Sequence, residues 1–139
     1  MKVLIINGPN LNLLGKREPG LYGNLGFDEV LSDLRQRYPG VHIDYFQSNI
    51  EGELIDCIQS ADGKYEGVIL NAGAYTHTSL ALGDAVKAVE VPVIEVHISN
   101  ILAREHFRHI SYIAPYCKGL ISGLGTEGYR LALEALKSS

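Results

Sequence analysis

Strand-length apolar segments alternate with amphipathic segments along the whole chain of 139 residues. Short apolar or alternating runs predict strands at 2–6, 41–46, 67–73, 93–98 and 118–125. Helical spacing of apolar residues predicts helices at 27–38, 53–61, 79–89 and 127–137. Because strands alternating with helices are joined by right-handed crossovers, the pattern predicts a parallel sheet with helices on both faces.

Five strands in a chain of this length fit one α/β domain, residues 1–139, with the flavodoxin-like strand order 2-1-3-4-5. Ligands of such sheets bind beyond the carboxyl ends of the strands. Polar clusters follow strands one, three and four here, in the segments NGPN, NAGAYTHTS and EVHISN. The fold therefore gathers these clusters at one edge of the sheet, which predicts an active site there.

Composition limits the class of protein and its partners. A hydrophobic content of 46% with 20% charged residues is typical of a soluble globular domain, and no apolar run is long enough for a transmembrane helix. The net charge of −4 gives no electrostatic basis for binding nucleic acid or an anionic membrane. Cys57 and Cys117 lack metal-ligand spacing and fit reduced packing thiols of a cytoplasmic protein.

A long connector, residues 7–23, follows the first strand. Strand-to-helix loops usually have ~2–6 residues, and longer ones are commonly functional. This one carries Arg17 and Tyr22. A guanidinium close to a phenol favours the phenolate and lowers its pKa from about 10 toward the range of a useful base. The same pair also fits a solvated arginine and a tyrosine that packs the loop, and Asn10 also fits ordinary turn chemistry.

The connector does not resemble a nucleotide-binding loop. It has no Ser/Thr-rich phosphate cradle, no G-x-G-x-x-G fingerprint and no Walker pattern, so flavin or nucleotide binding has little support. No acidic pair ends the first strand, which argues against a metal-dependent response-regulator domain.

Asn71 ends the third strand, and His77 lies just before the next helix. Thr78 or Ser79 is expected to cap that helix, whose free N–H groups suit a carboxylate or another polar ligand. Capping does not explain His77, so a ligand contact is the favoured interpretation.

Glu95 and His97 alternate on the fourth strand and share one face. A buried carboxylate beside an imidazole can hold its tautomer and its charge, although a structural ion pair has the same pattern. Ser99 follows where the strand stops and leaves backbone N–H groups available.

The segment AREHFRH offers Arg108 as a fork-shaped donor to ligand oxygens. If this stretch is helical, His106 and His109 are spaced i, i+3, but two imidazoles without a third ligand are weak evidence for a metal site.

Three segments together, INGPNLNLLGKREPGLYG, NAGAYTHTS and EVHISNILAREHFRH, resemble the signature segments of type II 3-dehydroquinate dehydratase, and GLISGLGTEGY resembles that family's last strand and helix start. The resemblance covers nearly the whole chain. It implies a shikimate-pathway lyase that converts 3-dehydroquinate to 3-dehydroshikimate and water. It also implies a flavodoxin-like fold, no cofactor, and a dodecamer built from four trimers.

The resemblance also implies roles for individual residues. Tyr22 resembles the base that removes the C2 proton, Arg17 its partner, and Asn10 the residue that stabilises the enolate through a water. His97 resembles the general acid for the C1 hydroxyl, with Glu95 behind it. The substrate-binding residues implied are Asn71 with the backbone N–H groups of Ile98 and Ser99 for the carboxylate, His77 and Arg108 for the ring hydroxyls, and Asp84 reaching into a neighbouring subunit's site.

The sequence departs from the family pattern at three positions. Gly83 stands where the family usually has arginine, Ile50 where many relatives have histidine, and His106 in place of a common glutamate. Two other functions remain open: a flavodoxin-like module that binds flavin or a partner protein, and a metal-dependent hydrolase using His77, His97 and His106.

Overall fold

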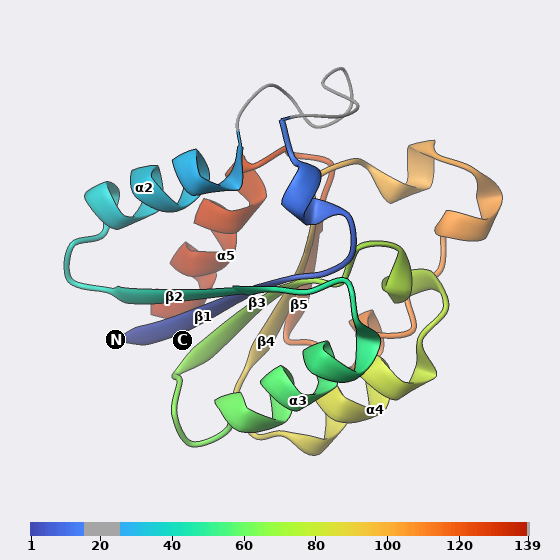
Figure 1. The fold of residues 1–139 in the computed structure, drawn as a ribbon, viewed down its shortest axis with the longest axis horizontal. Helices are drawn as coiled ribbons and strands as arrows, with labels where there is room; N and C mark the ends of the chain where they lie inside the picture. Colours follow the sequence, from blue (N-terminus) through green and yellow to red (C-terminus); the bar gives the residue numbers. More distant parts are fainter. Residues whose placement is uncertain (16–25, 139) are drawn as a thin grey trace.

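One parallel sheet organises the protein, and its computed structural model describes residues 1–15 and 26–138. The strands of these residues are β1 (Lys2–Asn7), β2 (His42–Gln47), β3 (Gly67–Asn71), β4 (Val93–His97) and β5 (Gly119–Ser122). They pair in parallel in the order β2-β1-β3-β4-β5 (Figure 1). The predicted fold class and strand order are confirmed.

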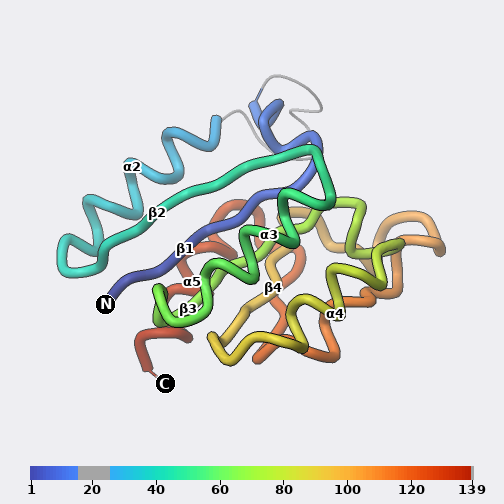
Figure 2. Tube along the Cα trace, turned by 60° about the horizontal axis from the view of Figure 1, so that its bottom comes forward, coloured from blue at the N-terminus to red at the C-terminus, as the bar shows by residue number. Residues whose placement is uncertain are grey.

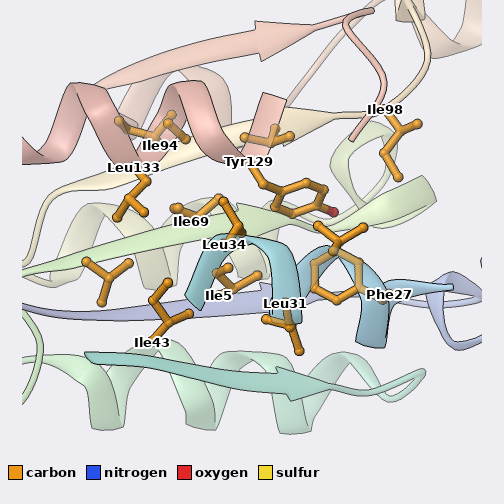
Figure 3. Close-up of a cluster of buried hydrophobic side chains, with 14 of the residues drawn as sticks. Ile5, Phe27, Leu31, Leu34, Ile43, Ile69, Ile94, Ile98, Tyr129 and Leu133 are labelled. Atoms are coloured by element: carbon orange, nitrogen blue, oxygen red, sulfur yellow. The ribbon is translucent and has the colours of Figure 1, made fainter. Parts of the chain in front are cut away.

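Two layers of helices cover the sheet. Helices α2 (Phe27–Arg37) and α5 (Glu127–Lys137) lie on one face, and α3 (Glu51–Ala61) and α4 (Leu80–Ala88) on the other (Figures 1 and 2). Alternation along the strands divides the core in the same way, since Ile5 packs with α2 and α5 while Ile6 packs on the opposite face. Figure 3 shows the first of these two clusters, in which α2 and α5 residues meet the strand residues. No helix within the described ranges is long and apolar enough to cross a membrane.

Glycines end two strands earlier than the sequence predicts. Strand β3 stops at Asn71 because Gly73 has a φ of 60° and starts the short 3-10 helix η2 (Gly73–His77). Strand β5 stops at Ser122 because Gly123 has a φ of 92°, which strands do not adopt. Helix α3 begins at Glu51, two residues before its predicted start.

Further short 3-10 helices lie in the connections that follow β1 and β4. They are η1 (Leu11–Leu13) after β1, and η3 (Ile101–Ala103), η4 (His106–Arg108) and η5 (Ala114–Tyr116) between β4 and β5. Gly8 lets the chain after β1 approach the end of β3, where its N–H donates to the Asn71 carbonyl at 2.7 Å. A Cβ at Gly8 would lie 2.5 Å from the Ala72 carbonyl oxygen, so a larger residue would separate these two loops.

Candidate active site

A cavity of about 260 Å³ opens beyond the carboxyl ends of β1, β3 and β4. This is the edge of the sheet at which the sequence predicts a site. The cavity brings together residues from loops that are far apart in the sequence. Of the predicted site residues, its lining includes Asn10, Asn71, His77, His97, Ile98, Ser99 and Arg108.

His97 and Glu95 form a buried pair at the end of β4. The Glu95 side chain is fully buried, and one of its carboxylate oxygens accepts a hydrogen bond from His97 Nε2. Because a carboxylate only accepts, the proton of this bond belongs to the imidazole. The pairing fixes the tautomer of His97 and leaves Nδ1 for a ligand in the cavity, which His97 lines.

Two further hydroxyl groups donate hydrogen bonds to the Glu95 carboxylate. Thr76 Oγ1 donates to it at 3.1 Å, and Ser111 Oγ lies 2.9 and 3.0 Å from its two oxygens. Ser111 Oγ also accepts the backbone N–H groups of Ile113 and Ala114, at 3.2 and 3.0 Å. Since these bonds occupy the acceptor sites of the hydroxyl, its single proton is directed to Glu95. The carboxylate therefore has hydrogen-bond donors on several sides and keeps one orientation.

His77 lies beside His97, with ring centroids 6.2 Å apart and rings inclined by 22°. Its Nδ1 is 2.8 Å from the Ile110 carbonyl oxygen, so Nδ1 carries the proton. Burial lowers the pKa of His77 from its ordinary value, which favours the neutral ring. A neutral His77 presents an unprotonated Nε2, which can accept a hydrogen bond from a ligand hydroxyl.

Asn71 and the peptide groups after β4 form the floor of the cavity. Asn71 is 3% exposed, and its Oδ1 accepts the Gly73 N–H at 3.1 Å. The carbonyls of His97 and Ile98 accept the N–H groups of Gly123 and Gly125, at 3.2 and 3.0 Å. Since C=O and N–H point in opposite directions across a trans peptide, the N–H groups of Ile98 and Ser99 point away from that glycine loop. Both residues line the cavity, so these N–H groups suit an anionic ligand.

Other residues of the cavity lining are more exposed, and two of them are cationic. Asn10 has a φ of 69°, and its backbone N–H donates to Asn49 Oδ1 at 3.0 Å. Arg104 and Arg108 follow β4 and line the same cavity. Arg108 Nε donates to Glu105 Oε2 at 2.8 Å, which leaves the terminal nitrogens of its guanidinium for a ligand.

Some predicted site residues lie elsewhere. Asp84 is exposed on α4 and does not line the cavity of its own chain. Arg17 and Tyr22 lie outside the described residues. His106 is exposed, pairs with His109 at a ring-centroid distance of 5.2 Å, and is not part of the cavity that contains His77 and His97.

Within the described ranges, no group of three His, Cys, Asp or Glu side chains could hold a metal ion. Burial raises the pKa of Cys57 to about 11 and that of Cys117 to about 12. Both thiols therefore stay protonated at neutral pH and do not act as thiolate ligands or nucleophiles.

Sequence reasoning missed three residues that support the site: Thr76, Ser111 and Tyr129. Thr76 lies in the segment NAGAYTHTS, but only the contact of its hydroxyl with Glu95 shows its role. Ser111 lies in the long connection between β4 and β5, and Tyr129 ends the segment GLISGLGTEGY, but nothing in the sequence connects them to Glu95 or Asn71. The expected helix cap at Ser79 is present, because its hydroxyl accepts the Leu82 N–H at 2.9 Å.

Gly83, the unusual glycine of α4, packs closely against the chain after η4. A Cβ at this position would lie 2.5 Å from the Tyr112 carbonyl oxygen. A larger residue here would require the segment that carries Ser111 and Tyr112 to shift.

Comparisons with known proteins show the family of the chain. The family model described as "Dehydroquinase class II" matches residues 1–137. The chain is 55% identical to the 3-dehydroquinate dehydratase of Rhizobium johnstonii, over 98% of this chain and 95% of the relative. It is also 55% identical to the 3-dehydroquinate dehydratase of Caldicellulosiruptor bescii, over 98% of this chain and 96% of the relative.

Solved structures show the same likeness. The type II dehydroquinase of Butyrivibrio crossotus superposes with a TM-score of 0.95 at 45% identity, over 99% of this chain and 97% of that one. A 3-dehydroquinate dehydratase-like protein from Bifidobacterium longum has a TM-score of 0.72 at 31% identity, over 99% of this chain and 96% of that one. The chain therefore belongs to the class II dehydroquinase family, a family of hydro-lyases, as the resemblance of its sequence predicts.

Proposed function

We propose that this protein is a 3-dehydroquinate dehydratase that converts 3-dehydroquinate to 3-dehydroshikimate and water by stepwise elimination through an enolate. One observation carries the proposal within the chain itself: His97, oriented by a fully buried Glu95, faces the same cavity as Asn71 and Arg108. An acid, an anion-binding floor and a cationic wall are what a hydroxylated keto acid needs. The family of the chain supplies the identity of the substrate.

Tyr22 is the proposed base, acting as a phenolate beside Arg17. The C2 proton is acidic because C2 is next to the ketone, so the C2–H bond breaks and its electrons form the enolate. Asn10, which lines the cavity, stabilises the enolate oxygen through a water. Leu11, Leu13 and Leu14 also line the cavity, so the connector that carries Arg17 and Tyr22 begins at its wall.

His97 is the proposed general acid. Collapse of the enolate breaks the C1–O bond and forms the C1–C2 double bond, and the departing hydroxyl takes a proton from the imidazolium to leave as water. Glu95 supports this step in two ways, since it holds the ring in place and stabilises the positive charge.

The other cavity residues hold the substrate. Asn71 and the backbone N–H groups of Ile98 and Ser99 bind the carboxylate. His77, whose unprotonated Nε2 can accept a hydrogen bond, and Arg108 bind the ring hydroxyls.

The proposal includes a homo-oligomer, a dodecamer of four trimers, working in the cytoplasm within the shikimate pathway. Asp84 is exposed on α4, away from the cavity of its own chain, and this fits a residue that completes a neighbouring subunit's site. Large apolar side chains also remain exposed on the single chain, as subunit interfaces require. The most exposed of them are Phe107, Leu102, Leu80 and Ile110, at 70, 67, 64 and 60%.

A spectrophotometric assay tests the function. Purified protein added to dehydroquinate is expected to raise the ultraviolet absorbance as the conjugated double bond of the product forms. Tyr22→Phe keeps the ring but removes the titratable oxygen, so kcat should fall at least ~10²-fold with little change in KM. Near wild-type turnover in this variant would remove Tyr22 from the mechanism. Visible absorbance of the protein with no turnover would support a flavin-binding module in its place.

Mixing two inactive variants tests the role of Asp84. Tyr22→Phe subunits supply an intact Asp84, and Asp84→Ala subunits supply an intact Tyr22. Refolding the two together should restore activity, because a site with its own Tyr22 can then use the partner subunit's Asp84. The shared site would be contradicted if sedimentation showed a fully active monomer, or if mixed oligomers of the two variants recovered no activity.

A further inference from the structure

A buried phenol links the floor of the cavity to the end of β1. Tyr129 lies in the first turn of α5 and is completely buried. Its hydroxyl is 2.9 Å from Asn71 Nδ2, at the end of β3, and 2.8 Å from Asn7 Oδ1, at the end of β1. Figure 3 shows this hydroxyl at the edge of the apolar cluster, next to Phe27. One side chain of a covering helix therefore joins two neighbouring strand ends.

The donor and the acceptor of each hydrogen bond in this network can be assigned. The Gly73 N–H can only donate, so Oδ1 of Asn71 faces Gly73 and Nδ2 faces Tyr129. The Tyr129 oxygen accepts from Asn71 and donates its own proton to Asn7 Oδ1. Asn7 Nδ2 then donates to the Tyr45 hydroxyl at 3.3 Å. Reversing the Asn71 amide would place Nδ2 against the Gly73 N–H and break its bond with Oδ1.

Tyr129 is suited to act as a fixed, neutral partner. Burial raises the pKa of its hydroxyl well above the ordinary value, so the proton stays in place at any working pH. The Phe27 ring packs edge-on against the Tyr129 ring, with centroids 4.9 Å apart. The hydroxyl thus has little freedom to move away from Asn71.

We propose that Tyr129 is a positioning residue that aims the Asn71 amide at an oxygen of the bound ligand. One N–H of Nδ2 is held by Tyr129, and no described residue accepts the other, although Asn71 lines the cavity. That second N–H suits a carboxylate or another strongly accepting oxygen. The inference rests on the proposed function for the identity of the ligand, and it deepens that function by adding Tyr129, which is itself outside the cavity.

The loss of this hydroxyl has a distinct expected signature. Tyr129→Phe keeps the ring and its packing but leaves Asn71 Nδ2 without its acceptor. A hydrogen bond contributes about 0.5–1.5 kcal/mol, so the KM for dehydroquinate should rise about 2- to 13-fold. The kcat should stay within about twofold, because Tyr129 does not touch the reacting atoms. Tyr65→Phe is the matched control. Tyr65 precedes β3, and its hydroxyl donates to Asp44 at 2.6 Å, so the removal of this hydroxyl should leave KM unchanged.

A double-mutant cycle separates positioning from general stability. In an Asn71→Ala background, Tyr129→Phe should raise KM no further, because the group it positions is gone. Equal multiplicative effects in both backgrounds would overturn the proposal, as would an unchanged KM with only a lower Tm. If Tyr129→Phe does not fold, Asn7→Ala removes the acceptor of the Tyr129 proton. It should give a smaller rise in KM, again only when Asn71 is present, and any other pattern would overturn the proposal.

The wild-type protein in the same assay keeps the two proposals apart. Wild-type turnover combined with no Tyr129 effect would overturn only the positioning role. No turnover of dehydroquinate by the wild type would overturn the proposed function, and the assignment of this ligand to Asn71 with it.

Discussion

The two sides of the cavity are built differently. The inner wall, Asn71, His97 and Ile98, is 3, 5 and 4% exposed and rests on strand ends. The outer wall, Asn10, Arg104 and Arg108, is exposed or half-buried and rests on short turns. Inner-wall partners come from other parts of the fold, such as Tyr129, which is 58 residues from Asn71. Outer-wall partners include close neighbours, such as Glu105, three residues from Arg108.

This difference in support matches the different roles proposed for the two walls, proton donation and substrate binding. A proton donor must be held in one tautomer and orientation, which requires partners that do not move when the ligand arrives. A group that grips hydroxyls can tolerate more freedom, because its contribution is mainly to binding. We therefore expect His97 of the inner wall to control kcat, Asn71 and Ile98 to control the anion contact, and the arginines of the outer wall to affect mainly KM.

The largest expected effect is at the inner wall. His97→Ala removes the proton donor of the departing hydroxyl, so kcat should fall about 10²- to 10⁴-fold while KM changes little. Steady-state kinetics on the purified variant measures both. His109→Ala, a histidine outside the cavity lining, is the control and should keep kcat near wild type. Normal turnover by His97→Ala would show that another group supplies the proton.

A smaller loss is expected behind the inner wall, at Ser111. Ser111→Ala removes a donor from the fully buried Glu95, and an unsatisfied buried group costs about 1–3 kcal/mol. If up to half of that cost affects the orientation of His97, kcat falls by at most about 13-fold. Ser111→Thr keeps a hydroxyl and should recover part of the loss, whereas a lower Tm with unchanged kcat would give Ser111 a purely structural role.

The fold was largely predictable because its signals are local. Apolar runs such as 67–71 and amphipathic helices repeat with clear periods, and parallel strands bring their carboxyl ends to one edge by geometry alone. Strand ends were harder to predict, because left-handed Gly73 and Gly123 decide them and glycine in a sequence does not reveal its φ. Asn71 and His97 could be found since each is the last residue of a strand, and His77 could be found since it lies in the short connection between β3 and α4.

The supports of these residues could not be found in the same way. Ser111 reaches Glu95 across 16 residues, and Tyr129 reaches Asn7 across 122 residues. A serine in a loop and a tyrosine on a helix fit many surroundings equally well. Only the packing of α5 and of the segment after η4 against the sheet determines which polar group each one meets.

A milder effect is expected at the outer wall. Arg108→Lys keeps the positive charge but loses the planar fork, so KM should rise about 3- to 10-fold with kcat within about twofold. Arg130→Lys on α5, an arginine that likewise pairs with a glutamate three residues away, is the matched control and should leave KM unchanged. A large fall in kcat for Arg108→Lys would mean that the outer wall also takes part in the proton transfers, and would remove the division between the two walls.

The last prediction is that a treatment has no effect, and it tests whether either wall carries a reactive amine. An alternative route to the same product condenses a lysine amine with the ketone, releases water and forms an imine, which borohydride would reduce to a stable secondary amine. Such a lysine needs a desolvated pocket to lower its pKa from about 10.4. The described lysines, Lys2, Lys64, Lys87, Lys118 and Lys137, are exposed, and none lines the cavity. Lys16, next to Arg17 in the connector, lies outside the described residues.

Borohydride added together with dehydroquinate is therefore expected neither to inactivate the protein nor to add mass to it. The intact mass and the residual activity are compared with a sample treated with borohydride alone, which removes the effect of the reductant itself. A ligand-sized increase in mass on Lys16 would make the connector the source of an amine nucleophile, and Lys16→Arg should then abolish the adduct. An adduct on any lysine would overturn the tyrosinate–enolate route, because the electrons of the broken C2–H bond would then form an enamine with the lysine nitrogen instead of an enolate.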